Sequence, residues 1–577
     1  MKTSRLRALG YTCTCALILL VNGCHRHRRT TSSENTAAYA TQIQSLLVSP
    51  KLPALRWPDY SDYQAAVTTF YDDRNQELAW TRDAKPTPQA TAFLQAFRDA
   101  GAKGLNPEDY DASRWPSRLQ QLNGKSADAI AAFDVTLTVD VMRYISDLRI
   151  GRVNPQHFNF GIDVQKKKYD LPEFISDNVV DASDIPKLIA GVEPESDQYR
   201  QTEQALAHYL DLARQQQATA APPLPDVAKP VATGGSYPAV PALWQRLQLE
   251  ADAPAGADIP AAYTSAVSDA VKSYQHRHGL EETGKLTSQT IRNLNVPLTD
   301  RVIQLQDSLE RWRWLPDQYL NARLIVNLPE FVLRGYTPEH KLDFTMKVVV
   351  GKVVGEHQTP VFAHMMRYLI FRPYWNVPTD IAKAELAPHI EKSPGYLATR
   401  NYEAVNGKGD VVPYTAKKVA EGGVIVREKP GPKNSLGLVK FMFPNAYDIY
   451  LHSTPSTWLF DHTRRDFSHG CVRVQKPDDL AAWVLNGQND KDGQPWDLDK
   501  VREAMNDGAD NHQVNLKTPL PIVIFYVTAE VEPDGHTHFF DDIYGYDADL
   551  QRVLSKGPPY PVKPEPAAPI PKPGETA

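Results

Sequence analysis

The stretch "DFSHGCVRV", residues 466–474, contains Cys471, and the interpretation of the whole chain starts from this cysteine. The sequence has 577 residues and four cysteines, and the other three lie within its first 24 positions. Cys471 therefore stands alone in the body of the chain. Either it is a small buried apolar residue, or it is a chemical reagent.

The N-terminal segment has the features of an export signal. A basic stretch (residues 2–7) precedes the short apolar run "ALILLV", residues 16–21, which is too short to span a bilayer as a mature helix. The run ends in "VNGC", which resembles a bacterial lipobox and implies lipidation of Cys24. The alternative is an ordinary secretion signal cut near the same place. Both predict export, and the lipobox predicts a membrane-anchored lipoprotein of the periplasm.

Export makes a single cysteine informative. Cys13 and Cys15 leave with the signal, and a lipidated Cys24 cannot pair with Cys471. Exported proteins meet an oxidising compartment, where an unpaired thiol is a liability unless it is buried or used.

The composition predicts several globular domains. Hydrophobic residues make up 42% and charged residues 23%, and the formal net charge is -6, so the chain lacks the basic footprint of a nucleic-acid-binding protein. The patterning predicts a multidomain α+β protein. Its expected segments are a signal (1–24), a tether (25–37), a helical region (38–215), a linker (216–238), a small helical unit (239–298), a connecting helix (299–320), a β-rich domain (321–532), a closing segment (533–554) and a Pro-rich disordered tail (555–577).

Cys471 has possible activators nearby in the sequence. His469 lies two positions before it and His452 lies 19 positions before it. A free cysteine has a pKa of about 8.5, and a neighbouring imidazolium lowers that value by about two units. Gly470 lets the chain approach closely, so that backbone N–H groups can stabilise an oxyanion.

Three other interpretations compete with a nucleophile. Cys471 can be a structural core residue, or it can form an intermolecular disulfide. It can also share a metal site with His452, His462 and His469, but these spacings match no common zinc pattern. We expect neither a metal nor a cofactor.

Several stretches resemble one enzyme family. "YLHSTP" and "SHGCVRV" (residues 450–455 and 468–474) are similar to the signature of the L,D-transpeptidases, whose YkuD-type domain has a His, a spacer and then Ser/Thr-His-Gly-Cys. "VVVGKVVGEHQTPVFAHMMRYLIFRPYWNVPTDIA" (348–382) resembles the large Gram-negative form. "FYDDRNQELAWT" resembles its helical scaffold domain, and "AVKSYQHRHGLEETGKLTSQTIRNLN" resembles a peptidoglycan-binding module.

The resemblance implies roles for the catalytic turn. Cys471 is the nucleophile and His452 the base that later acts as an acid. Ser468 and His469 shape the turn and orient the acceptor. The oxyanion is held by Tyr450 and by the N–H groups of Gly470 and Cys471.

Three further residues are candidates for substrate binding, each with a structural alternative. Arg473 either holds a substrate carboxylate or forms a structural ion pair. Trp375 and Asn376 either line the groove for the donor or simply pack.

The resemblance also implies a reaction. The thiolate attacks the third residue of a peptidoglycan tetrapeptide, D-Ala leaves, and a diaminopimelate side-chain amine of a neighbouring stem resolves the thioester as a 3-3 cross-link. Water as acceptor gives an L,D-carboxypeptidase, and a lipoprotein lysine gives an anchoring enzyme. Peptidoglycan stem peptides and other cell-wall synthases are the expected partners, with the membrane added if Cys24 is lipidated.

Residues 372–433 are long for a connector and are expected to form a capping insertion that excludes water. The alternative is a solvated surface loop. Two other protein classes remain open: a non-enzymatic wall-binding protein, and a secreted cysteine peptidase. The peptidase is disfavoured because its His would follow the Cys at a distance.

Overall fold

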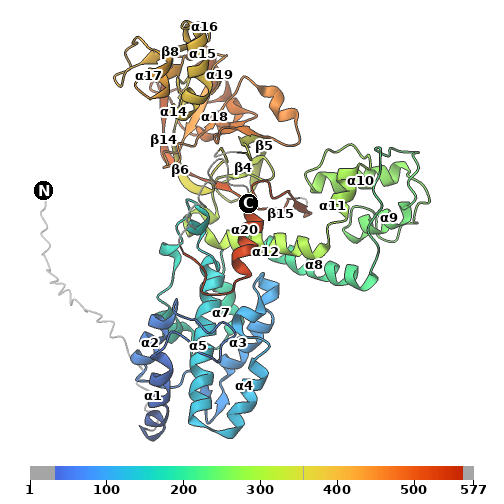
Figure 1. Ribbon diagram of the computed structural model, residues 1–577, viewed down its shortest axis with the longest axis vertical. Helices are drawn as coiled ribbons and strands as arrows, with labels where there is room; N and C mark the ends of the chain where they lie inside the picture. Colours follow the sequence, from blue (N-terminus) through green and yellow to red (C-terminus); the bar gives the residue numbers. More distant parts are fainter. Residues whose placement is uncertain (1–32, 355–356, 534, 563–577) are drawn as a thin grey trace, which may run out of the picture.

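The chain folds as a multidomain α+β protein, as the patterning predicts. The computed structural model describes residues 33–354, 357–533 and 535–562, and in it a helical N-terminal region, a small helical module and a β-rich domain are distinct (Figure 1). The predictions for residues 1–24, including Cys24, and for most of the Pro-rich tail lie outside these ranges. Within them, no helix has both the length and the apolar character needed to cross a membrane.

The helical N-terminal region is built around α5 (Ala127–Ile150), which is buried along almost its whole length. Asp134 on this helix is fully buried, and it accepts the backbone N–H groups of Ala79 and Trp80, each at 2.8 Å. These two hydrogen bonds anchor the start of the small hairpin of β1 (Thr81–Arg82) and β2 (Lys85–Pro86). The sequence did not predict this hairpin. The remaining elements are α1 (Ser33–Leu47), α2 (Gln64–Asp73), α3 (Pro88–Arg98), η1 (Ala100–Lys103), η2 (Pro107–Tyr110), α4 (Trp115–Gln121), η3 (Leu122–Gly124), η4 (Pro155–Phe158), η5 (Gln165–Lys167), α6 (Leu171–Phe174), η6 (Ile175–Val179) and α7 (Ile185–Val192).

Two long helices, α8 (Asp197–Thr219) and α12 (Leu298–Trp314), pack side by side and carry the module (Figure 1). The module consists of α9 (Val240–Leu249), α10 (Ser265–Arg277) and α11 (Ser288–Leu294), and Thr287 caps α11, as its position predicts. The connection after α8 is not free, because the Leu224 N–H donates to Asn295 Oδ1 at 2.8 Å. The module therefore has a fixed entry and a fixed exit.

The β-rich domain contains a nine-stranded sheet in the order β12-β5-β13-β11-β10-β6-β14-β3-β4. β4 also pairs with β5, so the sheet closes on itself like a barrel around an apolar core. The strands are β3 (Leu324–Asn327), β4 (Val332–Tyr336), β5 (Leu342–Gly351), β6 (Phe362–Phe371), β10 (Val439–Met442), β11 (Leu451–His452), β12 (Asp466–Ser468), β13 (Val472–Val474) and β14 (His512–Phe525). Helices α13 (Asp317–Leu320), η8 (Thr457–Asp461), α18 (Pro477–Val484) and α19 (Leu498–Asn506) accompany it.

Between β6 and β10 the chain leaves this sheet and builds a second, smaller core. A three-stranded sheet in the order β7-β9-β8 packs with short helices around its own apolar cluster, at the end of the molecule away from α1 (Figure 1). Its elements are β7 (Trp375–Asn376), α14 (Thr379–Ile381), η7 (Ala382–Leu386), α15 (Ala387–Lys392), α16 (Tyr396–Thr399), β8 (Tyr402–Val405), α17 (Ala416–Ala420) and β9 (Ile425–Glu428). Buried Asn434 holds together the two chain segments that connect this second core to the main sheet. Its Nδ2 donates to the carbonyls of Pro373 and Lys429 at 3.2 and 2.9 Å.

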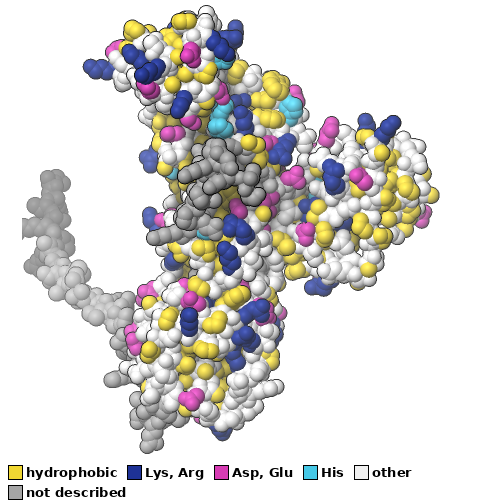
Figure 2. Space-filling model, viewed as in Figure 1, with side chains coloured by type: hydrophobic (Ala, Val, Ile, Leu, Met, Phe, Trp, Pro, Cys, Tyr) yellow, Lys and Arg dark blue, Asp and Glu magenta, His cyan; other side chains and the backbone are white. Residues whose placement is uncertain are grey.

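The C-terminal segment returns to the helical parts. The hairpin of β15 (Ala529–Val531) and β16 (Thr537–Phe539) packs near α8 and α12, and α20 (Tyr546–Leu554) follows it. Beyond α20, the Tyr560 hydroxyl donates to Asp109 Oδ2 at 3.2 Å, which brings the chain back to the N-terminal region. On the face drawn in Figure 2, basic and acidic side chains are interspersed over the helical regions.

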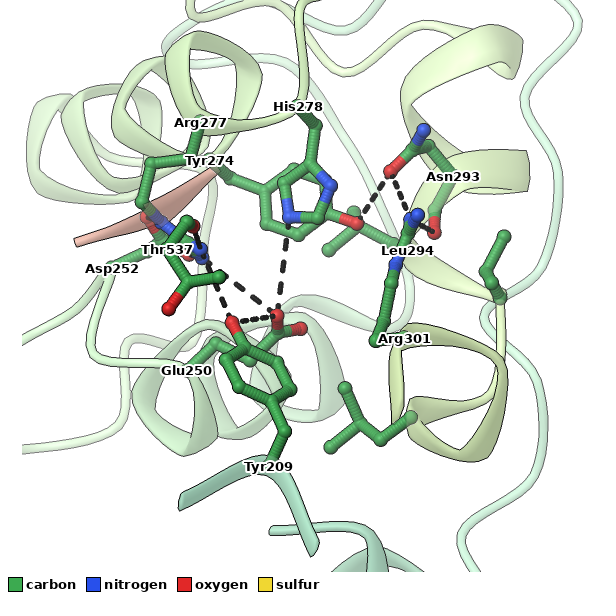
Figure 3. Close-up of polar contacts among 12 residues, drawn as sticks. Tyr209, Glu250, Asp252, Tyr274, Arg277, His278, Asn293, Leu294, Arg301 and Thr537 are labelled. Atoms are coloured by element: carbon green, nitrogen blue, oxygen red, sulfur yellow. Dashed lines mark hydrogen bonds and ion pairs between the residues drawn. The ribbon is translucent and has the colours of Figure 1, made fainter. Parts of the chain in front are cut away.

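A buried ionic cluster fixes the module against the rest of the protein (Figure 3). Arg277, 3% exposed at the end of α10, donates its Nε to Asp252 at 2.9 Å and an Nη to the Thr537 carbonyl of β16 at 2.9 Å. Tyr209 on α8 donates to Glu250 at 3.2 Å. The cluster thus joins the module to both α8 and the C-terminal hairpin.

We expect Arg277→Met to loosen this junction and to reduce the free energy of unfolding by about 3 kcal/mol, because it leaves the buried Asp252 carboxylate without its cation. Thermal unfolding and the rate of proteolysis within residues 220–238 would measure the effect. Lys272→Met, at an exposed position of the same helix, is the matched control. Equal stability of the two variants would contradict the assigned role of the cluster.

Candidate functional site

The site is organised by the pairing of β11 with β13. The two strands run parallel, and Leu451 pairs with Val472, both fully buried in the core of the β-rich domain. Side chains alternate between the faces of a strand, so the next pair, His452 and Arg473, lies on the opposite face. The burial of Leu451 and Val472 therefore fixes the face of the sheet on which the imidazole of His452 lies.

A third strand extends this face. In the antiparallel pairing of β10 with β11, Lys440 lies opposite His452, while Phe441 and Leu451 both face the core. Lys440, His452 and Arg473 consequently form a row across three neighbouring strands. Tyr450 shares this face, since its ring lies 5.9 Å from that of His452 and the Lys440 ammonium lies 5.4 Å from its ring centroid.

Cys471 lies at the head of β13, one residue before the strand begins. Its side chain is half-buried, and Sγ donates to the Asp448 carbonyl at 3.7 Å. The strand β13 follows Cys471 directly and separates it from α18. This short strand brings Cys471 and Arg473 beside β11, which periodicity over three residues could not indicate.

Ser468 holds the turn that presents the thiol. Its hydroxyl donates to the Cys471 carbonyl at 2.6 Å and accepts the Gly470 N–H at 3.1 Å. Gly470 has φ +119°, a conformation that favours glycine. The Gly470 N–H expected at the oxyanion is thus already bonded to Ser468, whereas Tyr450 directs both its backbone N–H and its hydroxyl at the sulfur.

A second layer supports this turn from behind. Buried Thr359 donates its hydroxyl to the Gly470 carbonyl at 2.7 Å and accepts the Gly351 N–H at 2.9 Å. Tyr544, from the segment after β16, donates to the Gly351 carbonyl at 2.7 Å. The turn therefore depends on the loop after β5 and on the C-terminal segment. No sequence motif links either segment to the turn.

His469 reaches the smaller core instead of the thiol. Its Nε2 lies 2.9 Å from Glu385 Oε1 on η7, and its ring makes an edge contact with His357, with 4.9 Å between centroids. The contact joins the catalytic turn to the region of residues 372–433. Burial lowers the pKa of His469, while the Glu385 carboxylate opposes that shift.

The imidazole of His452 is neutral. Burial, together with the positive charges of Arg473 and Lys440, lowers its pKa to about 3. Nδ1 lies 2.5 Å from the Ser453 carbonyl and must carry the proton, which leaves Nε2 as an acceptor. The sequence analysis considered an imidazolium beside the thiol, but two flanking cations and burial disfavour a third charge.

The thiol is also neutral at rest. Burial raises the pKa of Cys471 to about 11, although hydrogen bonds from Tyr450 and the charges of Lys440 and Arg473 all favour the thiolate. The resting pair is therefore a thiol and a neutral imidazole, which requires proton transfer when a substrate is attacked.

The three candidate substrate residues lie in two places. Arg473 belongs to the row beside His452. Trp375 and Asn376 form β7 of the smaller sheet, where Trp375 packs partly buried against the apolar cluster and Asn376 is exposed. Their roles remain predictions. Lys440 was missed, because a lysine in "GLVKFMFP" has no motif and only the register of β10 shows its position.

The residues that the sequence suggests as possible metal ligands do not form one cluster. His462 packs between Trp458 and Phe467, with ring centroids 5.6 and 5.5 Å away, while His452 is buried in its strand. Within the described ranges, no group of three or more His, Cys, Asp or Glu side chains could hold a metal ion.

A thiol, an acceptor imidazole and a braced turn are the parts that cysteine acyl transfer requires. Comparison with known families agrees with this. Residues 321–501 match the "L,D-transpeptidase catalytic domain", residues 236–294 the "Putative peptidoglycan binding domain" and residues 65–206 the "Scaffold domain". The chain thus combines an L,D-transpeptidase catalytic domain with a peptidoglycan-binding domain and a scaffold domain.

Parts of the chain are also similar to individual known proteins. A "Putative L,D-transpeptidase" of Haemophilus influenzae is 29% identical over 251 residues, which cover 43% of this chain and 48% of that protein, so the match spans about half the length of this relative. Two crystal structures of L,D-transpeptidases were also found. The one from Xylanimonas cellulosilytica has 15% identity, a TM-score of 0.16 and coverage of 53% of this chain and 100% of that one. The one from Stackebrandtia nassauensis has 14% identity, a TM-score of 0.18 and coverage of 53% and 97%.

The raised pKa of the thiol predicts how Cys471 responds to pH. A group with a pKa of about 11 stays protonated at pH 7, so the rate of alkylation by iodoacetamide should rise about tenfold per pH unit from pH 7 to about 10, with no step near 6.5. The Cys471→Ala variant supplies the background rate. A fast rate that stays level between pH 6 and 8 would instead show a thiolate paired with an imidazolium.

The support behind the turn predicts a second result. Thr359→Val keeps the volume but removes both hydroxyl bonds, so we expect a turnover of stem peptide about 10- to 100-fold lower, for a cost of about 1–3 kcal/mol. Thr359→Ser keeps the hydroxyl and should stay within a few-fold of wild type. Loss of the same size in both variants would indicate that packing of the methyl group matters, and not the hydrogen bonds.

Proposed function

We propose that this protein is a peptidoglycan L,D-transpeptidase that forms 3-3 cross-links by cysteine acyl transfer. The observation that supports the proposal is the register of β11 and β13, which pairs the buried His452, whose pKa is lowered to about 3, with Arg473, two residues after Cys471. The matched catalytic and peptidoglycan-binding domains support peptidoglycan as the substrate.

The first half-reaction acylates Cys471. The proton of the thiol moves to Nε2 of His452 as Sγ attacks the carbonyl carbon of the third residue of a donor tetrapeptide. The negative charge that develops on the carbonyl oxygen is stabilised by the Cys471 N–H and by Tyr450. The tetrahedral intermediate then collapses, the C–N bond breaks, and His452 returns the proton to the amine of the departing D-Ala.

The second half-reaction transfers the acyl group. The side-chain amine of a diaminopimelate on a neighbouring stem attacks the thioester, and His452 accepts one of its protons. The C–S bond breaks and the thiolate recovers that proton, which restores the resting pair. Because the flanking cations oppose an imidazolium, His452 carries the proton only briefly, between the two transfers.

The region of residues 372–433 suits the role of a cap over this reaction. The Glu385 carboxylate on η7 contacts His469 of the catalytic turn at 2.9 Å. Asn434 holds the two connections of this region to the main sheet together. Exclusion of water favours an amine over water as the acceptor of the acyl group. The cap therefore favours cross-linking over the L,D-carboxypeptidase alternative. The lipoprotein-anchoring alternative uses the same thiol and also an amine acceptor, so the cap does not distinguish it from cross-linking.

The proposed location follows from these domains. A peptidoglycan-binding module places the enzyme at the cell wall of the periplasm, and lipidation of Cys24 would anchor it to a membrane. Stem peptides are its proposed partners, with other cell-wall synthases acting on the same strands. A purely wall-binding protein is disfavoured by the intact Cys471 and His452.

The experiment is a muropeptide analysis of sacculi incubated with the purified protein. We expect wild type to release D-Ala and to form 3-3 cross-linked dimers, while Cys471→Ala abolishes both and still folds, because the substitution removes only the half-buried sulfur. Binding of sacculi should persist in this variant through the module.

Two outcomes would contradict the proposal. If Cys471→Ala kept its D-Ala release, the nucleophile would lie elsewhere. If folded wild type bound sacculi but turned over no stem peptide, the wall-binding alternative would hold. D-Ala release without dimers would mark a carboxypeptidase.

A further inference from the structure

Two cations flank the proposed base without a carboxylate of their own. The row on the face of the sheet opposite Leu451 and Val472 runs Lys440, His452, Arg473, and its neighbours at either end are Ile370 on β6 and Val349 on β5. Both end residues are apolar and buried. The row therefore offers no acidic side chain to either cation.

The contacts of Lys440 and Arg473 show the same lack of an acidic partner. Among the described residues, neither Lys440 nor Arg473 takes part in a salt bridge, and Arg473 Nε is buried with no hydrogen-bond partner. The Lys440 ammonium lies over the Tyr450 ring, which cannot neutralise it. The structural ion pair considered for Arg473 does not occur among the residues that the structure describes.

One negative charge does act on both side chains. Burial lowers the pKa of Lys440 and of Arg473, and the Cys471 thiolate alone opposes the shift in each case. That thiol is protonated at rest, as shown above. The resting site thus holds two desolvated positive charges with no anion, an arrangement that costs stability and is expected where a charged ligand will bind.

We propose that Lys440 and Arg473 form a carboxylate-binding pair that holds the donor stem peptide across His452. Arg473 offers a planar fork of donors with a free Nε, and Lys440 offers a point charge from the other side of the imidazole. Because Cys471 lies two residues before Arg473, at the head of the same strand, a bound carboxylate lies close to the carbonyl that Sγ attacks. The inference rests on the proposed function, because it takes the stem peptide as the donor.

A tetrapeptide stem carries two carboxylates that fit this pair. One is the terminal carboxylate of D-Ala, next to the bond that breaks. The other is on the side chain of the diaminopimelate that is attacked. Kinetics with three donors distinguish them: the free acid, the peptide with a terminal D-alaninamide, and the peptide amidated on the diaminopimelate.

We expect kcat/KM of wild type to fall about 10- to 100-fold for the one donor that lacks the bound carboxylate, as for the loss of a charge-assisted hydrogen bond. Lys440→Met and Arg473→Gln should lower kcat/KM for the free acid by a similar factor and should show little further loss with that amide. Lys440→Arg should recover most of the discrimination. Lys517→Met and Arg367→Gln, at exposed positions of the same domain, are the controls.

A second measurement does not require transpeptidase activity. An anion-binding pair beside Cys471 should favour iodoacetate over iodoacetamide as an alkylating agent. The ratio of the two rates should fall about tenfold in Lys440→Met and in Arg473→Gln relative to wild type and to both controls. The ratio compares two reagents on one thiol, so a change in the thiol's own reactivity cancels.

The outcomes separate this inference from the proposed function. If wild type treats all three donors alike and the alkylation ratio is unchanged in the variants, the carboxylate-binding pair is wrong while the transpeptidase stands. If no donor is turned over but the ratio falls in both variants, the proposed function fails and the anion-binding pair stands. Discrimination against one amide that disappears in both variants supports the pair and identifies the carboxylate.

Discussion

The site depends on the apolar register of three neighbouring strands. Phe441, Leu451 and Val472 all face the core, and each is followed or preceded by a polar residue that must face outward. A slip of one residue in β11 would bury a polar face and move the imidazole to the wrong side of the sheet. The free energy of packing in the core thus also enforces the geometry of the chemistry.

This arrangement gives the histidine an unusual partner set. In many nucleophile–histidine sites a carboxylate stabilises the imidazolium. Here Nδ1 donates to the carbonyl of Ser453, and the neighbours across the strands are Lys440 and Arg473. The carbonyl fixes the tautomer and raises the pKa of His452, but burial and the two cations lower that pKa by more. The site therefore starts from two neutral groups, and the charges that matter are those of the surrounding basic residues.

Much of the fold and of the candidate site could be predicted from the sequence. The parts that could not be predicted each have a physical reason. The multidomain α+β fold followed from composition and periodicity, and the family from the residues around Cys471 and His452. Lys440 escaped because its importance lies in the register of β10, a property of pairing and not of local pattern. The support from Thr359 and Tyr544 escaped because those residues are far apart in the chain and have no motif. The hairpin of β1 and β2 was missed because each strand has two residues, too few for any periodicity.

The hydrogen bond from Tyr544 makes the turn of Cys471 depend on a distant part of the chain. Tyr544 follows every strand of the nine-stranded sheet in the chain, yet it donates to Gly351 at the end of β5, beside the loop that braces this turn. A truncation just before residue 544 would leave every strand of this sheet in the sequence but would remove this brace. The turn of Cys471 is therefore coupled to the C-terminal segment across 193 positions of the chain.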